Sequence, residues 1–176
     1  HAYDADKIDK EIIVRNSKPE ESFEALDGKK YILKNNMCVI SDKKGALGLG
    51  GIIGGIRSGT EFETKNILLE AAYFYPSSVR KTANTLDIDT DAKYRFERGI
   101  DPNSIKEGLQ LATELIIKIC GGEPSKFSVV GKSTVNNRSI EIDNNKFRKV
   151  IGIPISSNET KKILNSLGFK TKVSKK

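Results

Sequence analysis

A single carboxylate within an apolar run is the feature of this sequence most suited to chemistry. Residues 68–74 read LLEAAYF, and the length and bounding residues of this run predict a buried strand that only Glu70 interrupts. Buried carboxylates are rarely left without a partner, so the position of Glu70 needs a reason. One interpretation is a structural ion pair with Arg80, Arg95 or Arg98.

A dense glycine stretch is the second such feature. Seven glycines fall within residues 45–59. Glycine weakens regular structure, so this density predicts close approach of the backbone to another group, or unusual φ angles. The stretch can be a backbone wall against a ligand or a crossing of tightly packed strands, and both interpretations can hold. A nucleotide loop is disfavoured, because neither GxxxxGK[ST] nor a strand, GxGxxG and helix in that order occurs.

The sequence supplies no independent nucleophile and no metal site by motif. GxSxG is absent, and no catalytic motif brings a cysteine together with a histidine. Residues that could bind a metal do not cluster in the sequence. Cys38 and Cys120 lie far apart without a CxxC pattern, which suits a reducing cytosol. Glu97 lies between Arg95 and Arg98, an arrangement more typical of a local ion-pair network than of a catalytic group.

Short strands and a hairpin are expected before the glycine stretch. The β-branched run 12–14 predicts a strand, and residues 37–40 predict another. Between them, Asp27-Gly28 supplies the positive φ angles of a tight hairpin turn.

Two helices are expected after it. Pro76 begins a short helical pattern, because its fixed φ suits a first turn. A longer helix is predicted over 101–120, with Asp101 as N-cap and Gly121-Gly122 as its stop. Its apolar face, which we expect to pack on the core, comprises Ile105, Leu109, Ala112, Ile116 and Ile119.

The remaining residues predict a linker and a second, smaller module. A strand over 126–130 precedes a polar linker over 131–137. A strand over 139–142 and a helix capped by Asp143 follow, and a capping box at 156–159 opens a last helix.

Composition describes a globular chain with an uneven charge. The 176 residues are 37% hydrophobic and 30% charged, and no apolar run approaches the roughly 20 residues of a membrane span. The net charge is +7, of which residues 140–176 carry +6, from nine Lys and Arg against three Asp and Glu. This basic end could neutralise RNA phosphates, or it could be a lysine-rich solvated surface. No leader peptide is visible.

Three motifs in order carry a family resemblance. GGIIGG (50–55), LLEAAYFYP (68–76) and TDAKYRFERGIDP (90–102) together closely resemble the β subunit of bacterial phenylalanyl-tRNA synthetase, in its editing domain. The resemblance identifies residues 1–132 as an N-terminally truncated editing domain. It identifies 138–176 as the C-terminally truncated start of a small basic domain. It implies an α+β fold, in which a mixed β-sheet domain with packed helices precedes a partial strand-helix-helix module.

The resemblance also implies a function. Phenylalanine and tyrosine differ by one hydroxyl, which a hydrophobic pocket rejects poorly, so a second site that binds the hydroxyl can select the wrong product. The family domain hydrolyses tyrosine mischarged onto the phenylalanine tRNA, in the cytoplasm, as part of a phenylalanine-tRNA ligase. The expected partners are that tRNA, tyrosine and the α subunit, in a heterotetramer. The fragment would need no cofactor, whereas the complete synthetase uses ATP and Mg, and no membrane is involved.

Five positions match the family's editing site. His1, the only histidine, matches the site histidine and is the expected catalytic residue. Glu70 matches the acid that contacts the tyrosine hydroxyl, and Gly54 matches the glycine at the pocket wall. Thr90 and Ala92 match pocket-lining positions, although Thr90 with its following Asp would serve a helix cap equally well. Hydrolysis would use a positioned water, with backbone N–H groups of the glycine stretch meeting the developing charge.

A second function class stays open. In this alternative the chain is an inactive scaffold that contacts RNA or another subunit. Salt distinguishes the two, because phosphate binding weakens steeply with salt and recognition of an amino acid scarcely changes.

Overall fold

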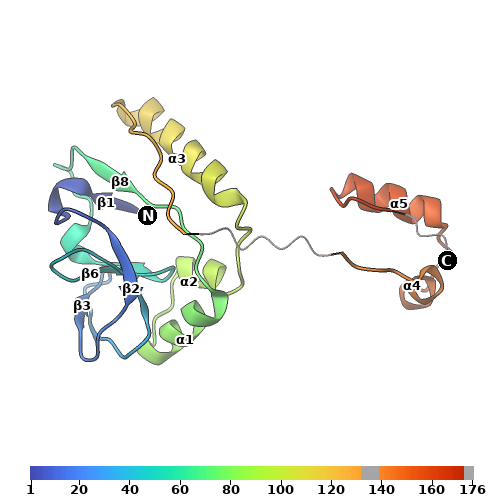
Figure 1. The fold of residues 1–176 in the computed structure, drawn as a ribbon, viewed down its shortest axis with the longest axis horizontal. Coiled ribbons are helices and arrows are strands. Elements are labelled where there is room, and N and C mark those ends of the chain that lie inside the picture. The colour runs from blue at the N-terminus through green and yellow to red at the C-terminus, as the bar shows by residue number, and fades with distance from the viewer. Residues whose placement is uncertain (132–138, 173–176) are drawn as a thin grey trace. The chain divides into compact units, whose positions relative to one another are not determined.

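A four-stranded antiparallel sheet forms the centre of the larger part of the chain (Figure 1). In the computed structural model, which describes residues 1–131 and 139–172, its strand order is β2-β5-β6-β7. The bounds are Ile13–Asn16 (β2), Cys38–Ser41 (β5), Ala46–Leu49 (β6) and Ile53–Gly54 (β7). Both strands predicted from β-branched and apolar runs are therefore confirmed, and the glycine stretch supplies the two strands that follow them.

Two smaller strand pairs flank this sheet. β3 (Ser22–Glu24) pairs with β4 (Lys30–Ile32), and the predicted hairpin is confirmed, with Gly28 at a φ of 77° in its turn. β1 (Ala2–Asp4) pairs with β8 (Ile67–Leu69). The strand expected over 68–74 is thus too long as predicted, because its partner β1 is only three residues in length. The expected burial is also wrong, because no residue of β8 is buried. Two 3-10 turns, Ala5–Lys7 and Ile56–Ser58, complete the sheet region.

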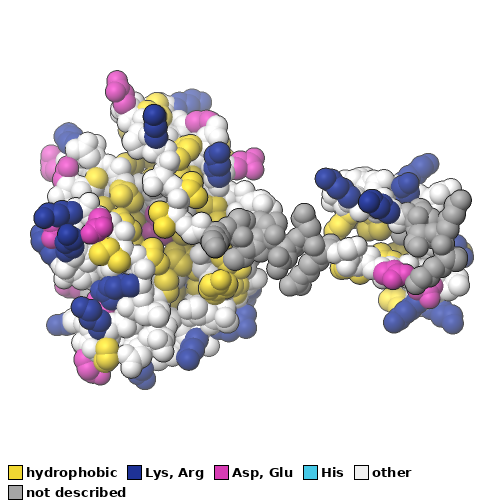
Figure 2. All heavy atoms as spheres, viewed as in Figure 1, with side chains coloured by type: hydrophobic (Ala, Val, Ile, Leu, Met, Phe, Trp, Pro, Cys, Tyr) yellow, Lys and Arg dark blue, Asp and Glu magenta, His cyan; other side chains and the backbone are white. Residues whose placement is uncertain are grey.

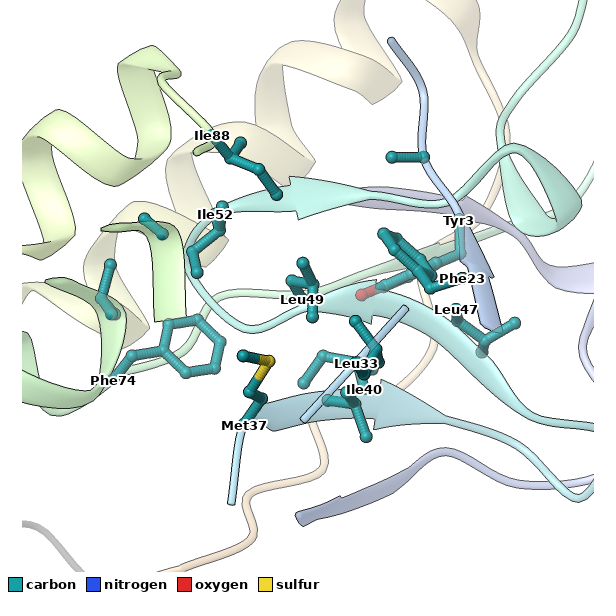
Figure 3. Packing of buried hydrophobic residues seen from close by; sticks show 14 residues of the cluster. Tyr3, Phe23, Leu33, Met37, Ile40, Leu47, Leu49, Ile52, Phe74 and Ile88 are labelled. Carbon is teal, nitrogen blue, oxygen red and sulfur yellow. The ribbon is translucent and has the colours of Figure 1, made fainter. Parts of the chain in front are cut away.

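The core lies between these sheets and the first helix (Figure 3). Figure 3 shows Phe74 and Met37 at one end of the buried cluster, and Tyr3, Phe23 and Leu47 at the other. Each such side chain contributes about 1.5–3 kcal/mol by leaving water, so the cluster holds the strand pairs together.

Helices α1 (Pro76–Leu86) and α2 (Asp91–Phe96) pack against each other, and α1 also contacts β5. Pro76 stands in the first turn of α1, as predicted. Val79 and Ala83 face the core and are 2% and 1% exposed, which fixes the face that α1 buries.

Helix α3 (Ser104–Cys120) differs from its prediction in two respects. It begins three residues later, because Asp101 forms a turn ahead of the helix, in which its carboxylate accepts a hydrogen bond from the N–H of Asn103. No residue of α3 is buried, and none belongs to the hydrophobic core cluster or packs against it. On the predicted face, Ile105, Leu109, Ala112 and Ile116 are only half-buried, and Ile119 is 78% exposed. The expected packing of this helix on the core is therefore wrong for the described chain.

Two predicted strands do not form. Residues 126–130 and 139–142 have no strand partner among the described residues, so alternating apolar residues alone do not make a ladder there. The predicted linker at 131–137 falls almost wholly on 132–138, outside the described residues.

The chain divides into two compact units, residues 1–135 and 136–176. In the second, α4 (Asn144–Ile151) and α5 (Ser157–Ser166) have the predicted caps, since Asp143 and Ser156 accept hydrogen bonds from their first turns. The α+β class is confirmed, and every strand pair described is antiparallel. Among the described helices, none has the length and apolar character needed to cross a membrane.

Candidate functional site

The β1–β8 pair brings His1 and Glu70 opposite each other. Ala2 pairs with Leu69, and the ladder continues by one step, because the N–H of Glu70 donates to the His1 carbonyl at 2.8 Å. The backbone amino nitrogen of His1 donates in return to the Glu70 carbonyl oxygen at 2.9 Å. Residues directly opposite in an antiparallel pair share a face, and alternate residues of one strand do too. His1, Tyr3 and Glu70 therefore lie on one face of this ribbon.

Glu70 accepts a hydrogen bond from a phenol. The Tyr3 hydroxyl donates to Oε2 of Glu70 at 2.5 Å, and the Tyr3 side chain is 2% exposed. Burial, with the charge of Glu70 and this hydrogen bond, raises the pKa of Tyr3 far above its ordinary value, so Tyr3 stays a donor. No ion pair involves Glu70 among the described residues, so the alternative pairing with an arginine is not found there.

Gly54 lies directly beneath the His1 ring. A Cβ added at Gly54 would stand 2.6 Å from Nε2 of His1 and 3.1 Å from a methyl of Leu26. Its cross-strand partner Gly48 has the Tyr3 hydroxyl oxygen 3.6 Å from the equivalent point. The His1 and Tyr3 rings meet edge to face with centroids 4.5 Å apart. Gly54 and Gly48, which lack side chains, thus allow the His1 and Tyr3 rings of the β1–β8 pair to pack against the main sheet.

The rest of the glycine stretch is filled by the chain itself. Phe74 lies against Gly50 and Gly51, and Phe96 also lies against Gly51. The N–H groups of Gly50, Ile52 and Gly55 each donate to backbone carbonyls. The strand-packing interpretation of the glycines therefore holds at these positions, and these three amides are already engaged within the fold.

Thr90 connects α2 to this stretch, and Ala92 follows it. Thr90 Oγ1 donates to the Ile52 carbonyl at 2.7 Å and accepts from the N–H of Lys93 at 3.1 Å, so its capping interpretation is confirmed. Ala92 is half-buried in the first turn of α2. Thr90 thus contacts the backbone at Ile52, two residues before Gly54. The other site residues form a series of contacts, in which His1 meets Gly54 and Tyr3, and Tyr3 meets Glu70.

The charges around Glu97 form a local network. Glu97 pairs with Arg98 at 2.8 Å and with Lys93 at 3.5 Å, and Arg98 also stacks on the Tyr94 ring at 3.7 Å. The structural interpretation of Glu97 is confirmed. Lys93, rather than the predicted Arg95, is its second cation.

Other reactive groups near the site are unsuited to covalent chemistry. Cys38 is half-buried, and burial with the nearby charge of Glu70 raises the pKa of its thiol, so the nucleophilic thiolate is disfavoured. No group of three or more His, Cys, Asp or Glu residues able to hold a metal occurs in the described chain. A surface hollow of about 280 Å³ contains none of the site residues. It is lined by Lys34, Asn35, Asn36, Met37, Lys81, Thr82 and Thr85.

Tyr3 is the site residue that sequence reasoning missed. Its signal was present, since His1 and Tyr3 are two residues apart and a strand at this point turns both to one face. The three-residue length of β1 concealed that signal, because so short a strand has no visible alternation.

Comparisons with known proteins find relatives along most of the chain. Residues 1–121 match the family model of the B3/4 domain. The phenylalanine–tRNA ligase beta subunit of Rhodopseudomonas palustris is 41% identical over 96% of this chain and 21% of its own length. The same subunit of Bradyrhizobium diazoefficiens is 40% identical over 96% and 21%. That of Wolbachia sp. subsp. Brugia malayi is 39% identical over 97% and 22%. The chain spans about a fifth of the length of these relatives.

Proposed function

Because the chain belongs to the B3/4 domain family, in the form found in bacterial phenylalanine–tRNA ligase beta subunits, we propose that residues 1–132 are an editing domain. Its reaction is hydrolysis of tyrosine mischarged onto the phenylalanine tRNA. Glu70 reads the tyrosine hydroxyl, His1 is the catalytic residue, and Gly54, Thr90 and Ala92 line the pocket.

The Tyr3–Glu70 hydrogen bond is the single observation that best supports this proposal. It is a phenol donating to a carboxylate, the same chemistry by which Glu70 would recognise a tyrosine ligand. Only Oε2 is engaged, and Oε1 has no hydrogen-bond partner among the described residues. Tyrosine would pair with Oε1, whereas phenylalanine would leave this oxygen unpaired against an apolar ring, which costs affinity.

The reaction follows from ester chemistry. A water attacks the ester carbonyl carbon, and the His1 imidazole takes the water proton. The bond from that carbon to the ribose oxygen then breaks, the ribose oxygen takes the proton back from the His1 imidazolium, and tyrosine and tRNA leave separately. The imidazole is exposed above Gly54 and edge-on to Tyr3, so a ligand and a water can reach it. Since the amides of Gly45, Gly50, Ile52, Gly55 and Gly59 are engaged within the fold, the oxyanion donors would have to be other amides of this stretch.

The complete protein extends this proposal. As part of a synthetase β subunit acting in protein synthesis in the cytoplasm, the domain would meet its tRNA in a heterotetramer with α subunits. ATP and Mg serve aminoacylation in that complex, and the editing step requires neither.

Deacylation of defined aminoacyl-tRNAs tests the proposal. We expect the Glu70→Ala variant to lose about tenfold or more in the ratio of Tyr-tRNA to Phe-tRNA hydrolysis, since one charge-assisted hydrogen bond is removed. The assay measures hydrolysis of the phenylalanine tRNA charged with tyrosine and of the same tRNA charged with phenylalanine. It is run with the 176-residue chain and with the complete synthetase. Glu63→Ala, which removes an exposed carboxylate from the same segment, is the matched control. An unchanged ratio in Glu70→Ala would contradict the role of Glu70.

A second candidate function rests on charge. Residues 140–176 carry nine Lys and Arg against three Asp and Glu, and basic side chains predominate on the face of this unit in Figure 2. If the chain is an RNA-contacting scaffold, its affinity for the tRNA falls steeply between 50 and 200 mM salt, and Glu70→Ala has no effect on it. Binding of free tyrosine should change little over the same range.

A further inference from the structure

The Tyr3 hydroxyl has no use in packing. The Tyr3 ring belongs to the core and is 2% exposed, a role that phenylalanine would fill equally well. A buried hydroxyl costs free energy unless it is hydrogen-bonded, and the partner of this one is Oε2 of Glu70. The hydroxyl therefore serves Glu70 rather than the core.

Glu70 is otherwise weakly held. It follows the last residue of β8 and is half-buried, and its backbone is fixed by the two hydrogen bonds to His1. Its side chain has three rotatable bonds, and the hydrogen bond from Tyr3 is the one that it makes within the described chain. Without that bond, the carboxylate would rotate among several positions and would lose entropy on meeting a ligand.

Tyr3 is itself a rigid donor. Its ring is held against His1 at a centroid distance of 4.5 Å, and its hydroxyl oxygen lies over Gly48 of the main sheet. Tyr3 pairs with Leu68, so it lies diagonally across the β1–β8 ladder from Glu70. The same ladder therefore sets the positions of both residues.

We propose that Tyr3 is a positioning residue for phenol recognition, which anchors Oε2 of Glu70 so that Oε1 is presented to the hydroxyl of a tyrosyl ligand. This inference rests on the proposed function. Selectivity then comes from a pair of residues: Glu70 supplies the acceptor and Tyr3 fixes its direction, as preorganised sites require.

Calorimetric titration of the 176-residue chain with L-tyrosine and L-phenylalanine tests the inference. For Tyr3→Phe, which keeps the ring, we expect the Kd for tyrosine to rise about tenfold and the Kd for phenylalanine to stay constant. Tyr31→Phe is the matched control, because Tyr31 also donates to a carboxylate, that of Asp27 at 2.7 Å, on the exposed hairpin. Its titration should match that of the unaltered chain.

The outcomes separate the two proposals. If Glu70→Ala abolishes the preference for tyrosine and Tyr3→Phe retains it, Tyr3 has no positioning role and the proposed function stands. A tighter tyrosine complex in Tyr3→Phe would make Tyr3 a competitor and would overturn the inference. Retained preference in Glu70→Ala, or no tyrosine binding by the unaltered chain, would overturn both.

A second measurement does not depend on how Tyr3→Phe folds. In the unaltered chain, the hydroxyl proton of Tyr3 should exchange slowly with water and should be visible by NMR. It should broaden beyond detection in Glu70→Ala. A hydroxyl proton that exchanges equally fast in both proteins would overturn the inference.

Discussion

Replacing Asp42 with alanine is expected to lower the free energy of unfolding by about 3 kcal/mol. Asp42 is 4% exposed and accepts hydrogen bonds at 2.7 and 2.8 Å from the Arg57 guanidinium. Its carboxylate also accepts from the N–H groups of Asp9, Lys44 and Gly45. The variant leaves these donors without their acceptor. Because the Arg57 side chain is 37% exposed, solvent screening keeps the loss near the lower limit for a buried pair.

Urea unfolding followed by circular dichroism measures this loss. Asp89→Ala is the control, since Asp89 forms an ion pair with Lys93 but its side chain is 90% exposed, so that pair contributes little. If both variants lose equal stability, the buried position of Asp42 is not what gives it its effect.

The same carboxylate gives a pH dependence with a definite sign. The hydrogen bonds from Arg57 hold the pKa of Asp42 well below its ordinary value in the folded chain, although burial opposes them. A folded pKa below the unfolded one means that the stabilisation is complete above the unfolded value of about 4. It is lost as the pH falls from there through the folded value. The difference in unfolding free energy between the unaltered chain and Asp42→Ala should therefore be constant from pH 8 to 5 and should shrink below pH 4.

Gly55→Ala is expected to destabilise the fold by about 2 kcal/mol, the second large effect. A Cβ at Gly55 would stand 2.8 Å from the Leu47 carbonyl oxygen and 2.9 Å from the Phe23 ring. That oxygen already accepts the N–H of Gly55 at 2.7 Å, so the backbone must move and the ladder weaken. Thermal unfolding should show the loss.

Gly54→Ala is the contrasting neighbour. Its Cβ would meet the His1 ring, which is exposed and can turn away, so the stability cost should be smaller than at Gly55. The ring would leave its place above β7, however, and tyrosine binding should weaken. Equal destabilisation by both substitutions, with tyrosine binding intact in Gly54→Ala, would show that Gly54 serves packing alone.

Local sequence signals predicted what local chemistry determines. The Asp27-Gly28 hairpin, the α1 start at Pro76 and the caps of α4 and α5 depend on a few adjacent residues, and all form. The strands expected over 126–130 and 139–142 do not, because a strand needs a partner that no local pattern supplies.

The site was predictable only in part, for the same reason. Glu70 stands out in the sequence because a carboxylate in an apolar run is costly. The three sequence motifs identify the family. The actual partner of Glu70, Tyr3, lies 67 positions away along the chain, and only the β1–β8 register brings the two together. The apolar face of α3 follows the predicted pattern, but it is only partly buried and does not join the core, since periodicity does not state what covers a helix.

NMR chemical-shift mapping of L-tyrosine and L-phenylalanine on the labelled chain, with Glu70→Ala alongside, tests most directly the claim that Glu70 reads a phenolic hydroxyl. The account predicts shifts at His1, Gly54 and Glu70 that tyrosine causes, that phenylalanine does not, and that Glu70→Ala abolishes. Shifts of equal size from both amino acids, or tyrosine shifts that persist in Glu70→Ala, would contradict it.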